Sequence, residues 1–207
     1  MNAVKSRREM YAESTRTALL ETGCRMFVEQ GYSAVAAEGL VQAAGLSRGA
    51  LYHHFGGKQG LFEEVFQQQA ERAVERIAAA TANVEDPWQQ FLAALDAALD
   101  FCTDRDYREI VFLQGPLALG WTRWRELDAH HFGGMLTTRI RILQDAGLIR
   151  DLPVELLAAT INAALNEICL RVAEADDLPA ARRDAGRLIR SLLDGIATNG
   201  PDTGRSD

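Results

Sequence analysis

The chain has 207 residues, of which 47% are hydrophobic and 25% charged, a composition typical of a folded globular protein. The opening MNAVKSRREM lacks the apolar core of a signal peptide, and no run of eighteen apolar residues predicts a membrane span. We therefore expect a cytoplasmic protein without a membrane partner. The three cysteines, Cys24, Cys102 and Cys169, fit no zinc or redox spacing, so we expect neither a metal nor a cofactor.

The net charge of −7 is unevenly distributed along the chain. Through Lys58 there are seven Lys and Arg against five Asp and Glu, net +2, whereas the remainder holds 15 against 24, net −9. This division indicates an N-terminal module that can approach a polyanion, joined to an acidic body that cannot.

Helical periodicity dominates the sequence, and no segment shows convincing strand alternation. Ser14 or Thr15 can cap the first helix, Pro87 suits the start of the fifth, and Pro116 disfavours continuation of the sixth. The pattern predicts an all-α fold of about nine helices, near residues 15–30, 37–44, 48–55, 58–80, 87–102, 104–114, 121–146 (kinked at Gly133–Gly134), 153–175 and 179–197. We expect a DNA-binding domain over 1–58, a helical body over 59–198 and a disordered tail over 199–207.

Residues 37–55 form two short helices joined by AGLS, the layout of a helix-turn-helix. If Ser47 caps the second helix, Leu51 and Phe55 face inward, toward the first helix. The outward side then carries donors suited to phosphates and base edges. The outward residues are Arg48, Gly49, Tyr52 and His53; His54 lies on the flank, and Lys58 can reach the DNA backbone.

The adjacent His53 and His54 also raise the possibility of a metal or catalytic pair. Neighbouring helical residues diverge by about 100°, so the two are poorly placed to chelate one ion. Zinc-protease pairs stand four residues apart around a glutamate, a spacing absent here. A purely structural pair of helices remains the plainer alternative.

The stretch FVEQGYSAVAAEGLVQAAGLSRGALYHHFGGKQGLFEEV, residues 27–65, closely resembles the DNA-binding domain of the TetR family of one-component bacterial regulators. The resemblance implies a homodimer whose ligand pocket releases DNA when it is filled. It also implies that DNA is contacted by Ser47, Arg48, Gly49, Tyr52, His53, His54 and Lys58. One departure stands at the start of the helix over 37–44, where Val35 and Ala36 replace the usual Thr or Ser. Unless Ser33 caps it from upstream, this helix is expected to be weak, all the more because it contains Gly39.

The body is harder to interpret. Its last two helices carry apolar stripes that fit a four-helix dimer interface, although both stripes could pack within one subunit. An aromatic and polar stripe suggests a pocket for a hydrophobic or aromatic molecule. The pocket candidates are Phe101, Phe112, Gln114, Trp121, Trp124, Asp128, His131, Asn162 and Asn166. Core packing with a polar end at the surface is the alternative for any one of them. An enzyme on the body is disfavoured because the chain has no Glu-x-x-His pair. We therefore expect a ligand-responsive repressor, with a DNA-binding protein free of small-molecule control as the alternative.

Overall fold

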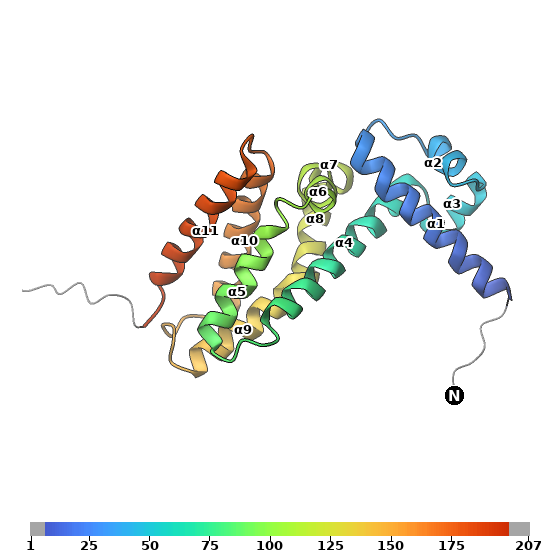
Figure 1. Cartoon of the computed structure of the whole chain (residues 1–207). Coiled ribbons are helices and arrows are strands. Elements are labelled where there is room, and N and C mark those ends of the chain that lie inside the picture. The colour runs from blue at the N-terminus through green and yellow to red at the C-terminus, as the bar shows by residue number, and fades with distance from the viewer. Residues whose placement is uncertain (1–6, 199–207) are drawn as a thin grey trace, which may run out of the picture. The chain divides into compact units, whose positions relative to one another are not determined.

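The computed structural model describes residues 7–198, which are helical apart from turns and short loops (Figure 1). Its helices are α1 Arg7–Gln30, α2 Ala37–Ala43, α3 Arg48–Phe55, α4 Lys58–Thr81, α5 Pro87–Asp100, α6 Arg105–Tyr107, η1 Arg108–Gln114, α7 Gly115–Leu119, α8 Trp121–Asp128, η2 Ala129–Gly133, α9 Gly134–Asp145, α10 Val154–Ala173 and α11 Leu178–Asp194. With α6–η1–α7 and α8–η2–α9 each taken as one run, the described residues form nine helices and no strand, which confirms the predicted fold. The tail over 199–207 lies outside the described residues.

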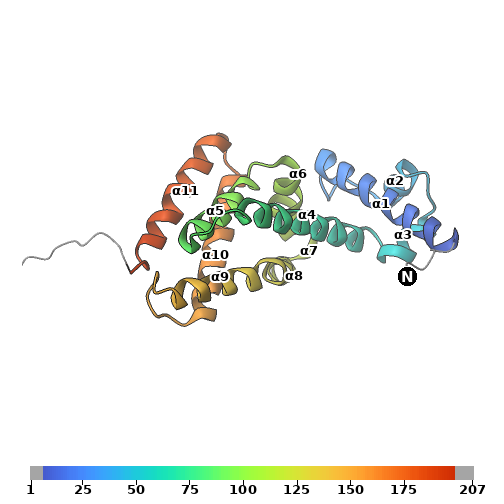
Figure 2. The same ribbon diagram turned by 60° about the horizontal axis from the view of Figure 1, so that its bottom comes forward.

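The described chain packs as two compact units. The first unit consists of the described residues up to Gln69 together with Arg105–Trp124. The second unit consists of Ala70–Asp104 together with the described residues from Arg125 onward. Figure 2 shows α1, α2 and α3 gathered in the first unit. An aromatic cluster forms part of its core, since the Phe62 ring lies 5.2 Å from that of Phe27 and 5.0 Å from that of Tyr32, centroid to centroid.

The start of α1 differs from the sequence expectation. The helix begins at Arg7, two turns before the predicted caps, and Thr15 is a buried residue within it. The residues upstream of Ser14 include good helix formers, Arg, Glu, Met and Ala, which allow the helix to continue toward the N-terminus. The prediction of a cap at Ser14 or Thr15 was therefore wrong.

The predicted stop at Pro116 was also wrong. The helix widens into the π-helical segment η1, and α7 then continues to Leu119 with Pro116 in its first turn. A first-turn proline costs little because that position needs no backbone donor. Trp124 packs against Gly115, where an added Cβ would lie 2.8 Å from the indole Cδ1. The Trp124 Nε1 donates to the Val111 carbonyl at 2.7 Å and fixes this turn.

The second unit contains the C-terminal end of α4 together with α5, α9, α10 and α11, and α10 packs against both α9 and α11 (Figures 1 and 2). Arg139 of α9 bonds the Thr81 hydroxyl at 3.0 Å and the Gln90 side-chain oxygen at 3.2 Å. Arg182 of α11 pairs with Asp100 of α5 at 2.8 Å. These polar contacts tie α9 and α11 to the helices beside them.

One described helix, α10, is long and apolar enough to cross a bilayer, with a mean hydropathy of 1.3 over its most apolar window. Only 28% of that window is buried inside the chain. Length and composition alone do not separate a membrane span from a helix that packs against protein, and Asn162, Asn166 and Glu167 interrupt the apolar sequence.

Candidate nucleic-acid interface and ligand cavity

A tight turn joins α2 to α3. Gly45 has a φ of +66°, a conformation that favours glycine, and the Leu46 amide donates to the Val41 carbonyl at 2.8 Å. The Ser47 hydroxyl then accepts from the Ala50 amide at 3.3 Å, which confirms Ser47 as the N-cap of α3. The sequence therefore fixes both the turn and the point at which α3 begins.

The inward faces of the two helices form the core of the motif. Leu40 and Val41 of α2 are buried, as are Leu51 and Phe55 of α3, which confirms the predicted phasing. The Arg16 guanidinium of α1 lies 5.4 Å from the Phe55 ring centroid. Helix α3 therefore packs its hydrophobic side against the other helices of the first unit.

The opposite face of α3 is open to solvent. Tyr52 is 48% exposed, and Ser47, Arg48, Gly49 and His53 are also exposed, while His54 is half-buried. These are the positions assigned to DNA from the sequence. Their contact with DNA remains a prediction. Lys58, the remaining residue assigned to DNA, is half-buried like His54.

Arg48 already has partners in the free protein. Its guanidinium pairs with Glu38 of α2 at 2.6 Å and lies 3.4 Å from the Tyr52 hydroxyl. The hydrogen bond with Tyr52 and the charge of Glu38 raise the pKa of Arg48, which keeps the group cationic. Both members of the ion pair are exposed, so a phosphate can compete with Glu38 at little cost.

His53 and His54 approach each other more closely than adjacent helical positions suggest. Their ring centroids lie 5.0 Å apart in an edge-on arrangement, and the His54 ring is also 6.2 Å from that of Phe55. Within residues 7–198 no three His, Cys, Asp or Glu side chains come together as a metal site. The pair presents two imidazole edges at the end of the recognition helix.

Lys58 has a structural role that sequence reasoning missed. Its Nζ donates to the Tyr32 and Val35 carbonyls at 2.9 Å each and lies 4.1 Å from the Tyr32 ring centroid. The ammonium therefore fixes the segment just before α2 to the start of α4. Two of its three N–H groups serve these bonds, and its predicted phosphate contact would use the third.

The N-terminus of α2 lacks a side-chain cap. Ala36 is the N-cap residue, and no side chain there accepts from the helix, which confirms the expected departure and shows that Ser33 does not supply the cap. Val35 is buried just upstream. The first turn of α2 is therefore held by packing and by Lys58 rather than by a cap.

The pocket candidates fall into two separate groups. Phe112, Gln114, Trp121 and Trp124 belong to the first unit, whereas Phe101, Asp128, His131, Asn162 and Asn166 belong to the second. In the first group, the Trp121 and Trp124 rings stack at 4.9 Å and Phe112 is buried beside Tyr107, 5.5 Å between centroids. None of these four residues lines the cavity beside Asp128 or the hollow over α11.

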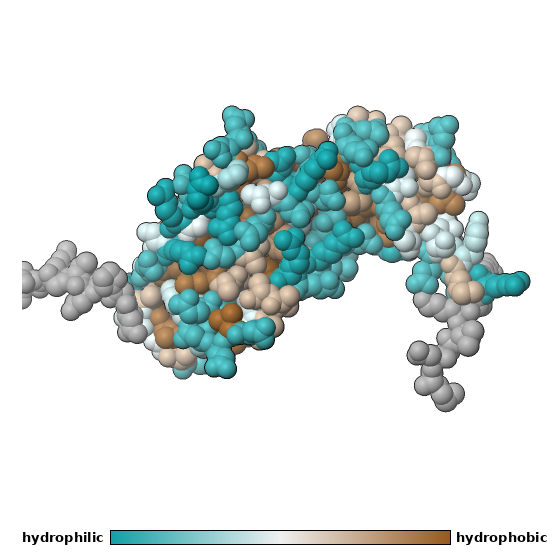
Figure 3. Space-filling view, viewed as in Figure 1, coloured by the Kyte–Doolittle hydropathy of each residue, from teal (hydrophilic) through white to brown (hydrophobic). Residues whose placement is uncertain are grey.

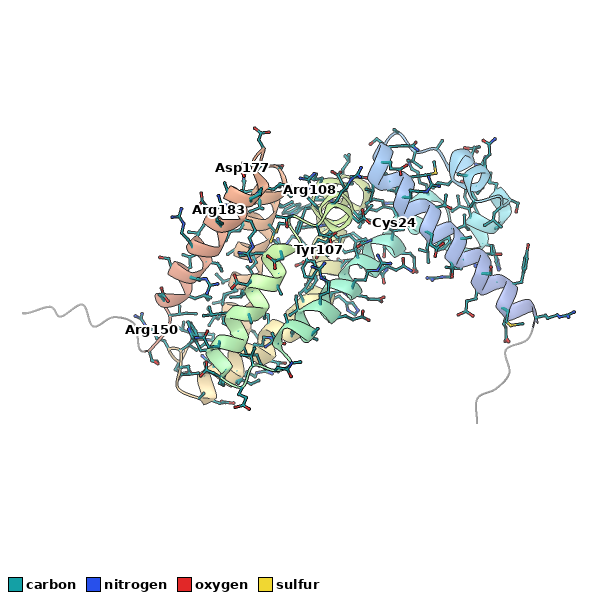
Figure 4. The ribbon with its side chains drawn as sticks, in the orientation of Figure 1. Cys24, Tyr107, Arg108, Arg150, Asp177 and Arg183 are labelled. Atoms are coloured by element: carbon teal, nitrogen blue, oxygen red, sulfur yellow. The ribbon has the colours of Figure 1, made fainter. Side chains whose placement is uncertain are left out.

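Gln114, at the end of η1, bonds the backbone near the C-terminal end of α1. Its Oε1 accepts from the Tyr32 amide at 2.8 Å, and its Nε2 donates to the Phe27 carbonyl at 3.0 Å. The same Nε2 reaches Glu109 at 3.3 Å, whose carboxylate also pairs with Arg108 (labelled in Figure 4). A side chain predicted to line a pocket therefore bonds the backbone at the C-terminal end of α1.

In the second unit, three of the candidates converge. The Asp128 carboxylate accepts from the Asn162 and Asn166 side-chain amides, each at 2.7 Å, with both bonds on Oδ2. The carboxylate lines a cavity of about 240 Å³ between the α8–η2–α9 run and α10. Burial raises the pKa of Asp128, while the two amide bonds and the charges of His131 and Arg125 act in the opposite direction.

Phe101 and His131 do not line this cavity. Phe101 is buried, with the Arg76 guanidinium 4.5 Å from its ring centroid. The His131 Nε2 is buried without a hydrogen-bond partner among the described residues, and burial lowers the pKa of its imidazole. Phe101 is therefore a core residue of the second unit, and His131 acts on Asp128 through its charge without lining the cavity.

A larger hollow of about 460 Å³ lies over α11 and is lined by Asp96, Arg182, Arg183, Asp184, Gly186, Arg187 and Arg190. Most of its arginines are already neutralised: Arg182 and Arg190 by Asp96, and Arg187 by Asp184. Arg183, labelled on α11 in Figure 4, is exposed. This hollow is an ion-paired surface rather than a cavity with a buried recognition group.

Comparison with known proteins agrees with this geometry. The profile of bacterial regulatory proteins of the tetR family matches residues 19–65, and that of the tetracyclin repressor-like C-terminal domain matches 88–196. The HTH-type transcriptional repressor Rv1474c of Mycobacterium tuberculosis is 28% identical over 171 residues, covering 82% of this chain and 88% of that protein. The HTH-type transcriptional activator FasR of Mycolicibacterium smegmatis is 32% identical over 89 residues, 43% of this chain and 41% of that protein.

Among solved structures, a TetR-family transcriptional regulator from Pectobacterium atrosepticum matches with a TM-score of 0.82 and 29% identity. The match covers 95% of this chain and all of that one. The C-terminal profile alone spans more than half of the chain, and the helix-turn-helix, its exposed recognition face and the nine-helix order agree with it. The chain is therefore a member of the TetR family of DNA-binding transcriptional regulators.

Proposed function

We propose that this chain is a cytoplasmic, ligand-responsive repressor that binds a pseudo-palindromic operator as a homodimer. The observation that carries the proposal is the open face of α3, where Arg48, Tyr52 and His53 project from a helix anchored on its other side. Three donor side chains on one exposed face suit the floor and phosphates of a major groove. The direction of control, repression, rests on the similarity to a repressor along most of both chains.

Exposed apolar side chains on α10 and α11 support the dimer. Leu156 of α10 and Leu188 and Leu192 of α11 are each more than half exposed, and most of the apolar window of α10 is not buried. Apolar patches interrupt the hydrophilic surface of this unit in Figure 3. A partner copy would bury these leucines, and a two-fold dimer implies two half-sites of opposite orientation in the operator.

The cavity beside Asp128 supports control by a small molecule. At about 240 Å³ it lies below the 300–1,000 Å³ typical of drug-sized ligands, so the effector is compact. The lining combines alanine methyl groups with amide and carboxylate groups, the Arg125 guanidinium and Thr137, and it contains no aromatic ring. The hydrophobic or aromatic effector expected from the sequence is therefore revised to a small molecule with one polar end.

Helix α8 belongs to both units, since its residues up to Trp124 lie in the first unit and those from Arg125 onward in the second. Helix α8 carries Asp128 at its end and Trp124 one turn earlier, and the Trp124 indole bonds the Val111 carbonyl of η1. At the end of η1, Gln114 bonds the backbone of Phe27 and Tyr32, just before α2. A ligand that favours one arrangement of α8 would thereby shift the population of α2–α3 arrangements that fit DNA.

Selection of bound sequences from random DNA tests the proposal, followed by a search for small molecules that release the protein from the selected site. We expect an inverted repeat, a dimer mass by light scattering and release by at least one compact compound. Failure to select any sequence would reject the DNA-binding role. Selection without release by any compound would favour a DNA-binding protein free of small-molecule control.

A further inference from the structure

We infer that the effector carries a protonated amine or a similar cationic donor, and that the Asp128 carboxylate, held by Asn162 and Asn166, is its anchor. This inference rests on the ligand control proposed above and names the chemical class of the ligand. It follows from the environment of the Asp128 carboxylate.

The carboxylate is nearly removed from water. Asp128 is 4% exposed, yet it lines the cavity, so the little surface that it keeps is available to a bound molecule. Two amide donors one helical turn apart on α10 converge on its Oδ2 at 2.7 Å. This arrangement fixes the orientation of the carboxylate, because rotation of the group would break both hydrogen bonds to Oδ2.

No direct ion pair in the described part of the chain neutralises this buried charge. Among the described residues Asp128 forms no ion pair, and Arg125 and His131 act on it only through space. A buried carboxylate is normally paired or neutralised, because burial of an isolated charge is strongly unfavourable. Two amide bonds offset part of that penalty, and a cation that enters the cavity would offset the rest.

The other lining groups define the remainder of the ligand. Ala158, Ala159, Ala163 and Gly133 present small apolar surfaces, which leave room for a compact alkyl or ring portion. The charged lining groups are the carboxylates of Asp128 and Glu155 and the guanidinium of Arg125, and Glu155 is paired with Arg141 at 2.5 Å. An anionic ligand would meet two carboxylates and one cation. The lining therefore favours a cation with a short apolar body over an anion of the same size.

The first test needs no ligand. Asp128→Asn keeps an oxygen that accepts from Asn162 and Asn166 but removes the buried charge. We expect the melting temperature of the empty protein to rise by about 2–4 °C at pH 7. Asp151→Asn, at an exposed position in the loop before α10, removes a charge of the same sign and should leave the melting temperature unchanged. An unchanged or lower melting temperature in Asp128→Asn would contradict an uncompensated carboxylate.

The second test uses three series of compounds that share a body and differ at one end. Benzyl, cyclohexylmethyl and hexyl bodies are each offered as the amine, the alcohol and the carboxylate, at equal ionic strength. For wild-type protein and Asp151→Asn we expect the amine to give the largest rise in melting temperature within at least one series. In Asp128→Asn that advantage should disappear.

Two results would overturn the inference. One is the absence of any preference for amines in all three series; the other is a preference that survives in Asp128→Asn. Binding of each variant to the selected operator is measured in parallel. Failure of the wild-type protein to select any DNA sequence would reject the proposed function itself, whereas specific DNA binding without an amine preference would reject only the role of Asp128.

Discussion

The two helices of the DNA-binding motif are held in different ways. Helix α3 is fixed at its N-terminus by the Ser47 cap. At its C-terminus the Gly56 amide donates to the Tyr52 carbonyl at 3.0 Å, and the Gly56 φ of +71° then ends the helix. Helix α2 has seven residues, no side-chain cap and a glycine inside it. It is held instead from outside, by buried Leu40 and Val41 and by the Lys58 bonds just upstream.

Helix α3 is therefore held by interactions at its own ends, whereas the position of α2 depends on contacts with its neighbours. The groups that we propose to face DNA stand on the helix that local interactions define, whereas α2 depends on α1 and α4 for its position. We expect amide protons of α2 to exchange faster than those of α3. A signal that displaces the end of α1, where Gln114 is bonded, would therefore act on α2 first.

The largest expected effect concerns the close approach of α4 to the end of α3. A Cβ on Gly60 would lie 1.9 Å from the Phe55 carbonyl oxygen, so Gly60→Ala must push the two helices apart. We expect a destabilisation on the order of 3 kcal/mol and accelerated amide exchange in α3. The matched control is Gly39→Ala, whose Cβ would meet only the Met26 Cε at an ordinary 3.7 Å. Equal stability of the two variants would argue against a tightly packed α3–α4 junction.

Loss of the Lys58 ammonium should come next in size. Lys58→Met keeps a long apolar chain but leaves the Tyr32 and Val35 carbonyls without their donor. Because the site is only partly buried, we expect a loss of about 2 kcal/mol in stability, with faster exchange in α2 than in α3. If melting and exchange stay unchanged while DNA binding weakens, Lys58 serves the DNA backbone alone.

A smaller and opposite effect is expected at the start of α2. Ala36→Thr places a hydroxyl at the N-cap position and should stabilise the protein by about 1 kcal/mol, raising the melting temperature by about 2–4 °C. DNA affinity should rise with it, because α2 then supports α3 more firmly. Ala43→Thr, at the other end of the same helix, is the control and should not stabilise. Identical melting and binding in Ala36→Thr and wild type would show that α2 needs no cap.

The helix-turn-helix was predictable from sequence because its determinants are local. Gly45, Ser47 and the four-residue spacing of Leu51 and Phe55 specify a turn, a cap and a buried face within eleven residues. The missing cap at Ala36 was visible for the same reason. The early start of α1 and the passage of the helix through Pro116 were missed. Ser14, Thr15 and Pro116 each suggested a helix end, but the helix continues through all three.

The pocket residues were predicted only in part, since their grouping depends on long-range packing. Asp128, Asn162 and Asn166 do meet, because the two asparagines share one face of α10. The Gln114 side chain donates a hydrogen bond to the Phe27 carbonyl, 87 residues away in sequence, and no local sequence pattern predicts such a contact. The Gly60–Phe55 approach was also invisible, because it arises from how two helices meet rather than from either helix alone.

The most direct measurement of the central claim is the affinity of wild type and Tyr52→Ala for the DNA selected by the wild-type protein. A dimer would lose one contact in each half-site, each worth about 1–3 kcal/mol, so we expect affinity to fall by about 30-fold or more. The dimer mass and melting temperature should not change, because Tyr52 is 48% exposed. Unchanged affinity in a folded, dimeric Tyr52→Ala would contradict the assignment of the α3 face to DNA.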